Sequence, residues 1–370
     1  MVIVLRTTDD VLRWADRLVE PPLRAAVGRL PEPSREVAEL RLGRPSGDAG
    51  PNASLYRALT LVCAAAVGGD PHDAVPAAVA VELMHHWSAI RRDLVDGPLD
   101  GAPWTVGTQP AALGGEALLA LAFDVIATGD PTRLGAARHG RAAAVAGAHA
   151  SLGRPRQRPA RPDAPGPDRA MMRVLGDTVQ ELLHGQHASL ALRDTPPGTA
   201  AEERTDLLRD CLAMVEQRTG ALFGCACALG AVAGGGDAAQ VERLHLFGVR
   251  LGLAVQFAED LLGIWAEDGG PGRPAYPDLR RRRRSLPVAA AIAAGADELG
   301  ALLEARGRLS DADAERAAKT IEQSGARDWC RRQAEELLSQ ALLALDLAFP
   351  APAAVAELIA LARRATIAPR

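Results

Sequence analysis

Four acidic residues form two pairs that lie far apart in the chain. Asp93 and Asp96 are three residues apart, whereas Glu259 and Asp260 are adjacent. Carboxylate oxygens are the ligands that Mg²⁺ prefers, and substrate phosphates often complete its coordination shell. Two such pairs on different helices could therefore hold magnesium on a phosphorylated substrate. Taken alone, a pair of acids at a helix end is more often a solvated or salt-bridged surface.

The first pair ends a predicted helix. That helix is expected to open near Pro76, because proline is favoured in a first turn, and to run to about Asp96. Its apolar stripe consists of Leu83, Trp87, Ile90 and Leu94. The adjoining face carries His85, Ser88, Arg92 and Asp96, with Asp93 one step round.

The second pair lies in a helix predicted from about Val241 to Glu267. One stripe of this segment is small and polar, and consists of Gly248, Gly252, Gln256, Asp260 and Gly263. Glycines spaced by four residues let a second helix or a ligand approach closely.

The rest of the chain predicts an all-α fold. Apolar residues recur at i, i+3, i+4 and i+7, and no segment alternates as a strand does. Only 3% of the 370 residues are aromatic, so the core depends on Leu, Ala and Val in closely packed helices. We expect one helical domain over residues 1–370. The Pro/Arg-rich tract 153–168 should be an insertion or loop, and residues 42–53 and 269–277 further loops.

Several functional classes are disfavoured by composition. The net charge of −4 gives no basic face for nucleic acid. The five cysteines are odd in number and lie mostly in apolar stretches, which indicates buried thiols in a reducing compartment. There is no charged segment leading into an apolar signal region, and the Gly/Ala-rich run 220–236 is too short for a membrane span. We therefore expect a soluble, cytoplasmic protein without a membrane span.

Six stretches carry a more specific pattern. In chain order they are VELMHHWSAIRRDLVD (81–96), GGEALLALAFDVIA (114–127), HGQHASLAL (184–192), RTGALFGCACALG (218–230), QFAEDLLGIW (256–265) and DLRRRRRSLPV (278–288). They resemble ELxHxxSLIHDDxxD, GDxLLxxAF, GQxxDL, KTxALxxxxxxLG, QxxDDxLGxxG and DLxxGKxxLP of the isoprenyl (polyprenyl) diphosphate synthase family. The chain is identified as a member of that family.

The resemblance implies a single bundle of ten or more helices around a deep central pocket, usually in a homodimer. In the family, the two aspartate motifs hold three magnesium ions on the diphosphate of an allylic substrate. The diphosphate leaves, and an apolar cavity protects the allylic cation from water. Chain-elongating members then add isopentenyl diphosphate to that cation.

The first aspartate motif departs from the family pattern. Arg92 replaces its leading aspartate, which is a direct metal ligand in the family, and can pair with Asp96 at i+4. We expect Arg92 to act in catalysis with Asp93 and Asp96 by donating to a diphosphate oxygen, so that fewer than three Mg²⁺ ions are needed. The second motif keeps two carboxylates, and the metal ligands expected from the two motifs are Asp93, Asp96, Glu259 and Asp260.

The isopentenyl diphosphate site departs further. The family's GKxLRP stretch aligns with Asn52–Arg57, so its lysine is Ala53 and its arginine is Tyr56. The twin arginines after the first motif align with Leu99 and Asp100. His85 keeps its place as a diphosphate contact, and Arg57 is a candidate replacement one position out of register. An anion site needs donors, and we therefore expect no ordinary chain elongation.

The positions that the family uses for the allylic diphosphate retain more of the family pattern. Arg218 and Thr219 replace the family's Lys-Thr pair, Gln256 is retained, and Arg283 takes the place of the final lysine. Arginine can contact phosphate with two parallel donors where lysine supplies a point charge. The alternative for the run 280–284 is a solvated charged face.

Two functions follow from these departures. The first is an enzyme that ionises an allylic prenyl diphosphate and then cyclises it, or transfers it to an acceptor other than isopentenyl diphosphate, as terpene synthases related to the family do. The second is a non-catalytic subunit that pairs with an active synthase as a heterodimer and modulates it. Retention of four acids favours the enzyme, since such a cluster costs stability if no cation binds. Arg92 favours the subunit.

Overall fold

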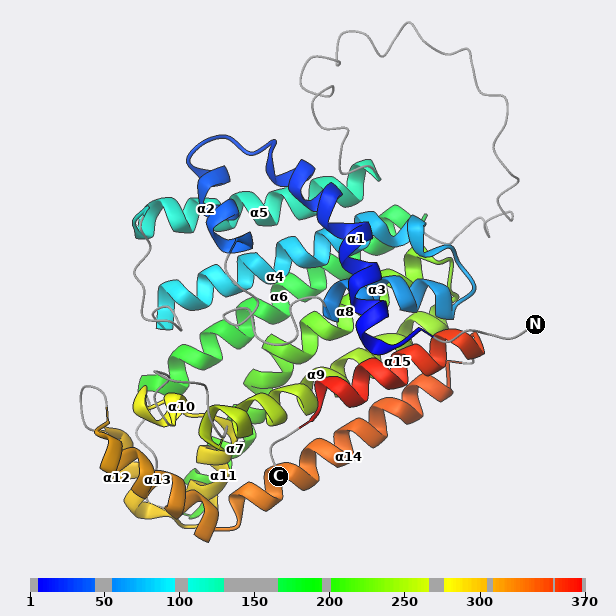
Figure 1. The fold of residues 1–370 in the computed structure, drawn as a ribbon. Helices are drawn as coiled ribbons and strands as arrows, with labels where there is room; N and C mark the ends of the chain where they lie inside the picture. Colours follow the sequence, from blue (N-terminus) through cyan, green and yellow to red (C-terminus); the bar gives the residue numbers. More distant parts are fainter. Residues whose placement is uncertain are drawn as a thin grey trace, which may run out of the picture. The chain divides into compact units, whose positions relative to one another are not determined.

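The computed structural model describes residues 6–43, 55–96, 106–129, 166–194, 201–265, 276–304, 309–348 and 350–367. Helices make up its regular structure, and the described residues contain no strand (Figure 1). The predicted all-α class is therefore confirmed. The predicted loops 42–53, 153–168 and 269–277 lie largely outside the described residues; Leu42 still belongs to a helix, and Pro167 and Pro277 each open one.

The chain divides into two compact units. Unit 1 comprises residues 1–176 and 228–241, and unit 2 comprises residues 177–227 and 242–370, so the boundaries fall inside three helices. The expectation of a single domain over the whole chain stays a prediction.

Unit 1 contains the helix of the first aspartate motif. Its complete helices are α1 (Thr8–Val27), α2 (Ser34–Leu42), α3 (Leu55–Ala66), α4 (Val75–Asp96) and α5 (Thr108–Thr128), with a short 3₁₀ turn η1 (Pro71–Ala74) before α4. The helix predicted from Pro76 to Asp96 is thus confirmed to within one residue. Its apolar stripe is also confirmed at Leu83, Trp87 and Ile90, which are all buried.

Local sequence explains how α1 forms. Thr7 and Asp10 make a capping box, in which each side chain accepts a hydrogen bond from the other residue's backbone N–H. The apolar face that follows is buried, and consists of Val11, Ala15, Val19, Leu23 and Ala26. This face repeats every three or four residues, which places α1 against the unit 1 core.

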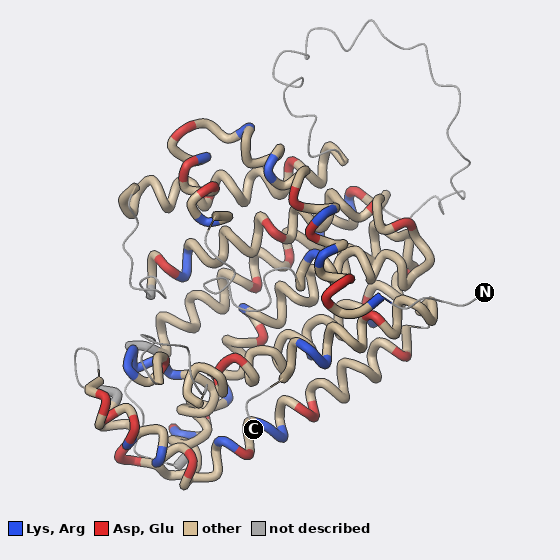
Figure 2. The backbone as a smooth tube through the Cα atoms, viewed as in Figure 1, with Lys and Arg blue, Asp and Glu red and all other residues tan. Residues whose placement is uncertain are grey.

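One helix of unit 1 has the length and apolar composition of a membrane span. Helix α5 carries few charges, and 44% of its most apolar window is buried inside the protein (Figure 2). Much of the buried surface packs on α4: an added Cβ at Gly115 would lie 3.4 Å from the Ile90 side chain. A Cβ at that distance would make only ordinary contact. The tighter approach is at Gly114, where an added Cβ would lie 2.6 Å from the Val37 side chain on α2.

Unit 2 contains the second aspartate motif. Its complete elements are α7 (Ala201–Val215), the π-helical turn η3 (Glu216–Gly220), α10 (Pro277–Arg280), α11 (Leu286–Ala293), α12 (Asp297–Glu304), α13 (Asp311–Gln323), α14 (Ala326–Asp346) and α15 (Pro352–Ala365). Helices α6 (Pro167–Asp194), α8 (Ala221–Ala233) and α9 (Ala238–Trp265) contain the unit boundaries. The helix predicted from Val241 is confirmed as α9, which begins three residues earlier.

The glycine stripe of α9 packs against α8. An added Cβ at Gly248 would lie 2.4 Å from the Phe223 carbonyl oxygen, and one at Gly252 would lie 3.0 Å from the Gly220 Cα. The two backbones therefore approach more closely than larger side chains would allow. All five cysteines are buried free thiols, as predicted. Burial raises the pKa of the Cys211 and Cys225 thiols to about 12, which makes them unreactive.

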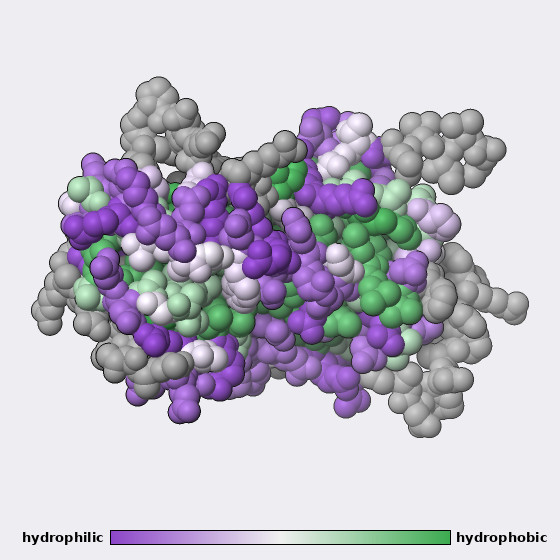
Figure 3. All heavy atoms as spheres, turned by 90° about the horizontal axis from the view of Figure 1, so that it is seen from below, coloured by the Kyte–Doolittle hydropathy of each residue, from purple (hydrophilic) through white to green (hydrophobic). Residues whose placement is uncertain are grey.

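Charged side chains are interspersed along the described helices (Figure 2). On the face drawn in Figure 3, hydrophilic residues surround several small apolar areas. Many arginines pair with acids three or four positions away on their own helix, such as Arg13 with Asp10 and Arg24 with Glu20. Exposed pairs of this kind contribute about 0.3–0.5 kcal/mol each and support helices rather than binding sites.

Candidate active site

Unit 2 brings several of the matched stretches together through one chain of hydrogen bonds. The Thr219 hydroxyl donates to Gln256 Oε1 at 2.7 Å, and Gln256 Nε2 donates to Asp260 Oδ1 at 2.8 Å. The other oxygen, Asp260 Oδ2, accepts from the Leu286 backbone N–H at 2.8 Å. Thr219 and Gln256 are 37 positions apart, and Asp260 and Leu286 are 26 apart. Three matched stretches are therefore linked through the Asp260 carboxylate.

Asp260 has a structural task at this junction. Leu286 is the first residue of α11, and Ser285 before it makes no side-chain cap. Asp260 supplies the missing cap from α9, and a carboxylate at a helix N-terminus is also favoured by the helix dipole. Burial raises the pKa of Asp260, while Arg283 and the two hydrogen bonds oppose that shift. Its neighbour Glu259 is only half-buried.

Arg218 and Thr219 lie on the π-helical turn η3. Such turns are rare inside helices and are frequent at functional sites. Arg218 Nη1 lies 3.3 Å from Ser189 Oγ and 3.6 Å from Met214 Sδ. Gly185 gives this side chain room, because an added Cβ there would lie 2.6 Å from Arg218 Cγ. The wide turn and the glycine together fix the position of the guanidinium group.

The arginine run after α10 is held by neighbouring segments. Arg283 Nη1 lies 3.2 Å from Asp278 Oδ2, Arg280 pairs with Asp311, and Arg282 and Arg284 donate to the carbonyls of Leu302 and Leu192. The run is therefore no simple solvated face. The guanidinium groups of Arg280, Arg282 and Arg284 join the α10–α11 corner to other parts of unit 2. Arg283 pairs with Asp278 inside the same corner, and Arg281 is exposed.

A glycine makes room for Asp278. An added Cβ at Gly263 would lie 2.3 Å from Asp278 Oδ2, so only glycine lets that carboxylate lie against α9. Asp278 is 6% exposed and lies beside Arg283, its ion-pair partner. The glycine of the second aspartate motif thus serves the Asp278–Arg283 pair.

Unit 1 holds the residues of the first motif on the last turns of α4. Asp93 is 4% exposed, and its Oδ1 lies 3.9 Å from Arg92 Nε. The predicted pairing of Arg92 with Asp96 stays a prediction, because the Asp96 side chain lies outside the described residues. That Asp93 and Asp96 hold magnesium together with Glu259 and Asp260 also stays a prediction.

His85 lies about two helix turns before Asp93, in a buried aromatic and histidine cluster. Its ring centroid is 4.9 Å from Tyr56 and 5.2 Å from His86. Burial lowers the pKa of His85 well below its usual value, and His86, Arg41, Arg92 and Arg57 lower it further. His85 is therefore a neutral imidazole, which can offer a substrate one hydrogen bond and no charge.

Arg57 does not replace the lost cations of the isopentenyl diphosphate site. Its Nη1 lies 3.1 Å from Asp16 and 3.0 Å from Glu20, and its Nε lies 3.3 Å from Glu82 Oε1. Three carboxylates thus surround one buried guanidinium. The candidate role for Arg57 is wrong, because an arginine paired with three acids has no free charge for a diphosphate. Ala53, Leu99 and Asp100 lie outside the described residues.

Comparison with known proteins identifies the chain. The polyprenyl synthetase family model matches residues 51–323. A (2E,6E)-farnesyl diphosphate synthase from Mycobacterium bovis is 33% identical and covers 91% of this chain and 87% of its own length. A geranylgeranyl diphosphate synthase from Mycobacterium tuberculosis is also 33% identical, with 93% and 89% covered. This chain belongs to the polyprenyl synthetase family.

The fold agrees with that assignment. The crystal structure of a polyprenyl synthetase from Streptomyces coelicolor A3(2) superimposes with a TM-score of 0.78 at 31% identity, and the match covers 96% of this chain and 99% of that one. The predicted family and helical architecture are therefore both confirmed.

This polyprenyl synthetase family member departs from the family patterns at two further positions, which the sequence analysis did not identify. The family's DLxxGKxxLP pattern places glycine at position 282, where this chain has arginine, and Arg282 adopts φ 56°. This left-handed conformation is one that glycine adopts without strain. The GQxxDL pattern places an acid at Ser189, the residue that Arg218 contacts. Both could have been found by reading each matched stretch position by position.

Proposed function

We propose that this chain binds an allylic prenyl diphosphate and ionises it with the help of Mg²⁺, without using isopentenyl diphosphate as the acceptor. The proposal rests on one asymmetry. The residues matched to the allylic side are linked through Thr219, Gln256 and Asp260, whereas Arg57 beside the other diphosphate site is paired with Asp16, Glu20 and Glu82. The similarity to a farnesyl and a geranylgeranyl diphosphate synthase supports the substrate class.

The residues present are of the right chemistry for magnesium. Asp93, Asp96 and Glu259 are the carboxylates that would hold it, and Asp260 would serve mainly by positioning the α9–α11 junction, since both its oxygens accept internal hydrogen bonds. When bound, Mg²⁺ would neutralise charge on the departing diphosphate. His85, Arg218, Thr219 and Arg283 are the proposed diphosphate-binding residues, and Arg92 is proposed to donate to a diphosphate oxygen.

The reaction is a break of the bond between the allylic carbon and the diphosphate oxygen. Both bonding electrons leave with inorganic pyrophosphate, and the cation that remains is quenched by cyclisation and loss of a proton, or by an acceptor. Lysine is absent from the proposed set, so bidentate arginine contacts would orient the leaving group.

One observation favours the second candidate, a non-catalytic subunit paired with an active synthase. Arg92 lies 3.9 Å from Asp93 and places a positive charge where the family binds a metal. Under this alternative the acids of the two motifs maintain the fold, as Asp260 does for α11.

The test is release of pyrophosphate from C10, C15 and C20 allylic diphosphates by the purified chain in Mg²⁺. Substrate-dependent release, abolished by EDTA and accompanied by hydrocarbon or transferred product, would support the enzyme. No release from any of the three, with stimulation of a co-expressed intact synthase, would support the subunit and contradict our proposal.

A further inference from the structure

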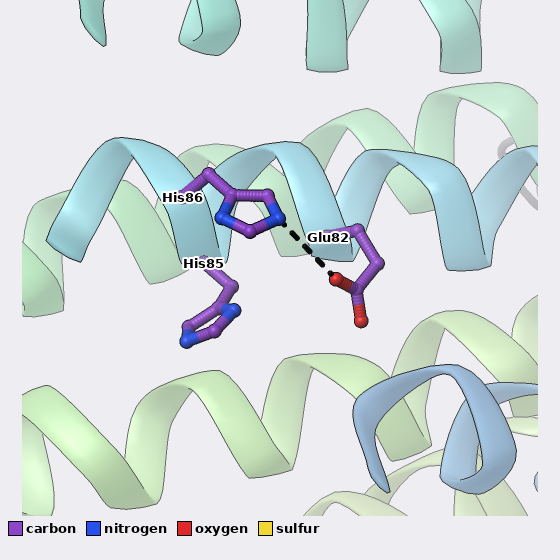
Figure 4. Close-up of side chains that lie close together, drawn as sticks. All are labelled: Glu82, His85 and His86. Atoms are coloured by element: carbon purple, nitrogen blue, oxygen red, sulfur yellow. Dashed lines mark ion pairs between the residues drawn. The ribbon is translucent and has the colours of Figure 1, made fainter. Parts of the chain in front are cut away.

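Helix α4 carries a second cluster of donor groups about two turns before the first aspartate motif. Glu82, His85 and His86 each place one ligand atom within 4.8 Å of the others. The spacing Glu-x-x-His-His brings them together, because residues three and four apart lie on neighbouring turns of a helix. Figure 4 shows the His86 ring turned toward the Glu82 carboxylate, with His85 below them on the same helix.

The polar atoms of this cluster are incompletely paired. Among the described side chains, Nδ1 of His85 and both ring nitrogens of His86 are buried without a hydrogen-bond partner. His86 is 6% exposed and Glu82 is 1% exposed. Each buried unsatisfied group costs about 1–3 kcal/mol. Unpaired imidazole nitrogens beside one buried carboxylate therefore indicate a ligand that bonds to nitrogen lone pairs.

We propose that Glu82, His85 and His86 form a binding site for a divalent transition metal ion of the zinc class, separate from the magnesium site of the aspartate motifs. Two imidazoles and one carboxylate are a ligand set for Zn²⁺ or Co²⁺ and a poor one for Mg²⁺, which prefers oxygen ligands. Three protein ligands leave a fourth position open for water or another small ligand.

The distances require only a small adjustment of side chains. His86 Nε2 already lies 3.7 Å from Glu82 Oε2. In a tetrahedral zinc site with bonds of about 2.1 Å, two ligand atoms lie roughly 3.4 Å apart. All three ligand atoms lie within 4.8 Å of one another, and rotation of the side chains about their own bonds would bring them to this spacing.

Arg57 contacts both oxygens of Glu82: its Nε lies 3.3 Å from Oε1, and its Nη2 donates to Oε2 at 3.5 Å. The guanidinium thus orients the carboxylate beside His86, as second-shell partners of metal ligands do. Asp16 and Glu20 on α1 in turn neutralise Arg57. The long-range pairing of α1, α3 and α4 thus fixes one ligand of the site.

The charged groups around the cluster are of both signs. The guanidinium groups Arg41, Arg57 and Arg92 act on the two imidazoles, and the carboxylates Asp16 and Glu20 lie beside Arg57. Binding of a cation would therefore depend on its direct ligands rather than on the charge of the surroundings. Neutral imidazoles are also the form that binds a metal.

Co²⁺ is the probe for this site, because tetrahedral or five-coordinate Co²⁺ bound to imidazole absorbs visible light strongly. The tag-free full chain would be stripped with a chelator, titrated with Co²⁺, and followed by absorbance and by metal content after desalting. We expect one tightly held Co²⁺ per chain, displaced by Zn²⁺. H86Q and E82Q should each weaken binding by at least about 10- to 100-fold, the loss seen when second-shell partners are removed.

Two matched variants locate the ion. H72Q removes an exposed histidine of unit 1, whose side chain is 66% exposed, and should bind Co²⁺ as the wild type does. E259Q alters the second aspartate motif and should also keep the imidazole spectrum. Absence of tight Co²⁺ binding in the wild type would overturn the proposal. So would unchanged binding in a folded H86Q or E82Q, or loss of the spectrum in E259Q alone.

Discussion

At the scale of single residues, partners decide what each charged group can do. His85 and Arg92 lie where the family pattern places substrate or metal contacts, and Arg57 lies one position from such a place, yet their surroundings differ. Arg57 is enclosed by three acids, His85 is neutral in a buried cluster, and Arg92 lies beside Asp93. Of these three, Arg92 combines a charge with partial exposure, since 29% of its side chain is exposed.

The role of Arg92 can be tested by two substitutions. R92A should lower pyrophosphate release and raise the Mg²⁺ concentration needed for half-maximal rate, because a positive charge near the leaving group is lost. R92D should lower that Mg²⁺ requirement by restoring a carboxylate to the first motif. Initial rates across a magnesium series give both results. Equal activity of R92A and wild type at every Mg²⁺ concentration would exclude this role.

The Glu82–His86 pair should make stability depend on pH in two opposite ways. Burial raises the pKa of Glu82 from 4.5 to about 7, although Arg57 opposes the shift. Stability from this group is therefore full below pH 4.5 and is lost as the pH rises through 7. Burial, with Arg41 and Arg57, lowers the pKa of His86 from 6.5 to about 3. Its contribution is full above pH 6.5 and is lost as the pH falls toward 3.

Each variant should remove one of these trends. Between pH 5 and 6, the unfolding free energy of E82Q should fall more steeply on acidification than that of wild type, by up to about 1.4 kcal/mol per pH unit. H86Q should change the slope by a similar amount in the opposite direction. Urea unfolding followed by circular dichroism at several pH values measures both slopes. Parallel curves for all three metal-free proteins would contradict the pKa shifts.

At the scale of elements, the motif residues of unit 2 make the contacts that hold neighbouring helices together. Asp260 caps α11 from α9, Gly263 admits Asp278, and the π-helical turn carries Arg218 and Thr219 to α9 through Gln256. A residue of the second motif can therefore be required because it joins helices, even if it never contacts metal.

Glu259 and Asp260 should separate these two roles. D260A should lower the unfolding free energy by about 1–3 kcal/mol without any magnesium, because the Leu286 N–H and the Gln256 amide lose a buried acceptor. E259A should abolish pyrophosphate release and leave the fold intact. Thermal unfolding and turnover of both variants decide the matter. If E259A keeps full turnover, the second motif is not the metal site.

Gly263 offers a second test of these contacts between helices. G263A should destabilise the protein by about 1–3 kcal/mol, the usual cost of overpacking, because its methyl group would overlap Asp278 Oδ2. G176A is the matched control, since no atom lies within 4 Å of a Cβ added there. In the helix α6 that change should stabilise by up to about 1 kcal/mol. Equal melting temperatures for the two variants would argue against the close contact.

At the scale of the whole molecule, the two halves of the family's reaction have diverged. The stretches matched to the allylic side keep their polar residues, whereas Ala53, Tyr56, Leu99 and Asp100 stand where four cations are expected. This difference between the two sets of positions is the reason that we propose a reaction with a single diphosphate substrate.

Labelled isopentenyl diphosphate tests this divergence directly. With C10, C15 or C20 allylic primers and Mg²⁺, we expect no label in longer prenyl diphosphates, because a trianionic diphosphate cannot bind without donors. The Streptomyces coelicolor polyprenyl synthetase, assayed in parallel, is a family reference. Labelled products one or more isoprene units longer than the primer would show that this chain elongates after all.

The sequence by itself determined those properties that repeat locally. The 3.6-residue period predicted α4 within one residue and α9 within three at its start, and apolar neighbours predicted the burial of every cysteine. Ordered motifs determined the family. These inferences succeed because helix formation and burial of a stripe depend on residues within a few turns of each other.

Only the tertiary structure decided the state of the charged residues. Arg57 lies 41 residues from Asp16 and 25 from Glu82, and Asp260 lies 26 from Leu286, so no local pattern shows that they meet. Burial and partners then set whether a group is charged, capped or paired, which is why Glu82 and His86 titrate far from their ordinary values while their sequence looks unremarkable for a helix.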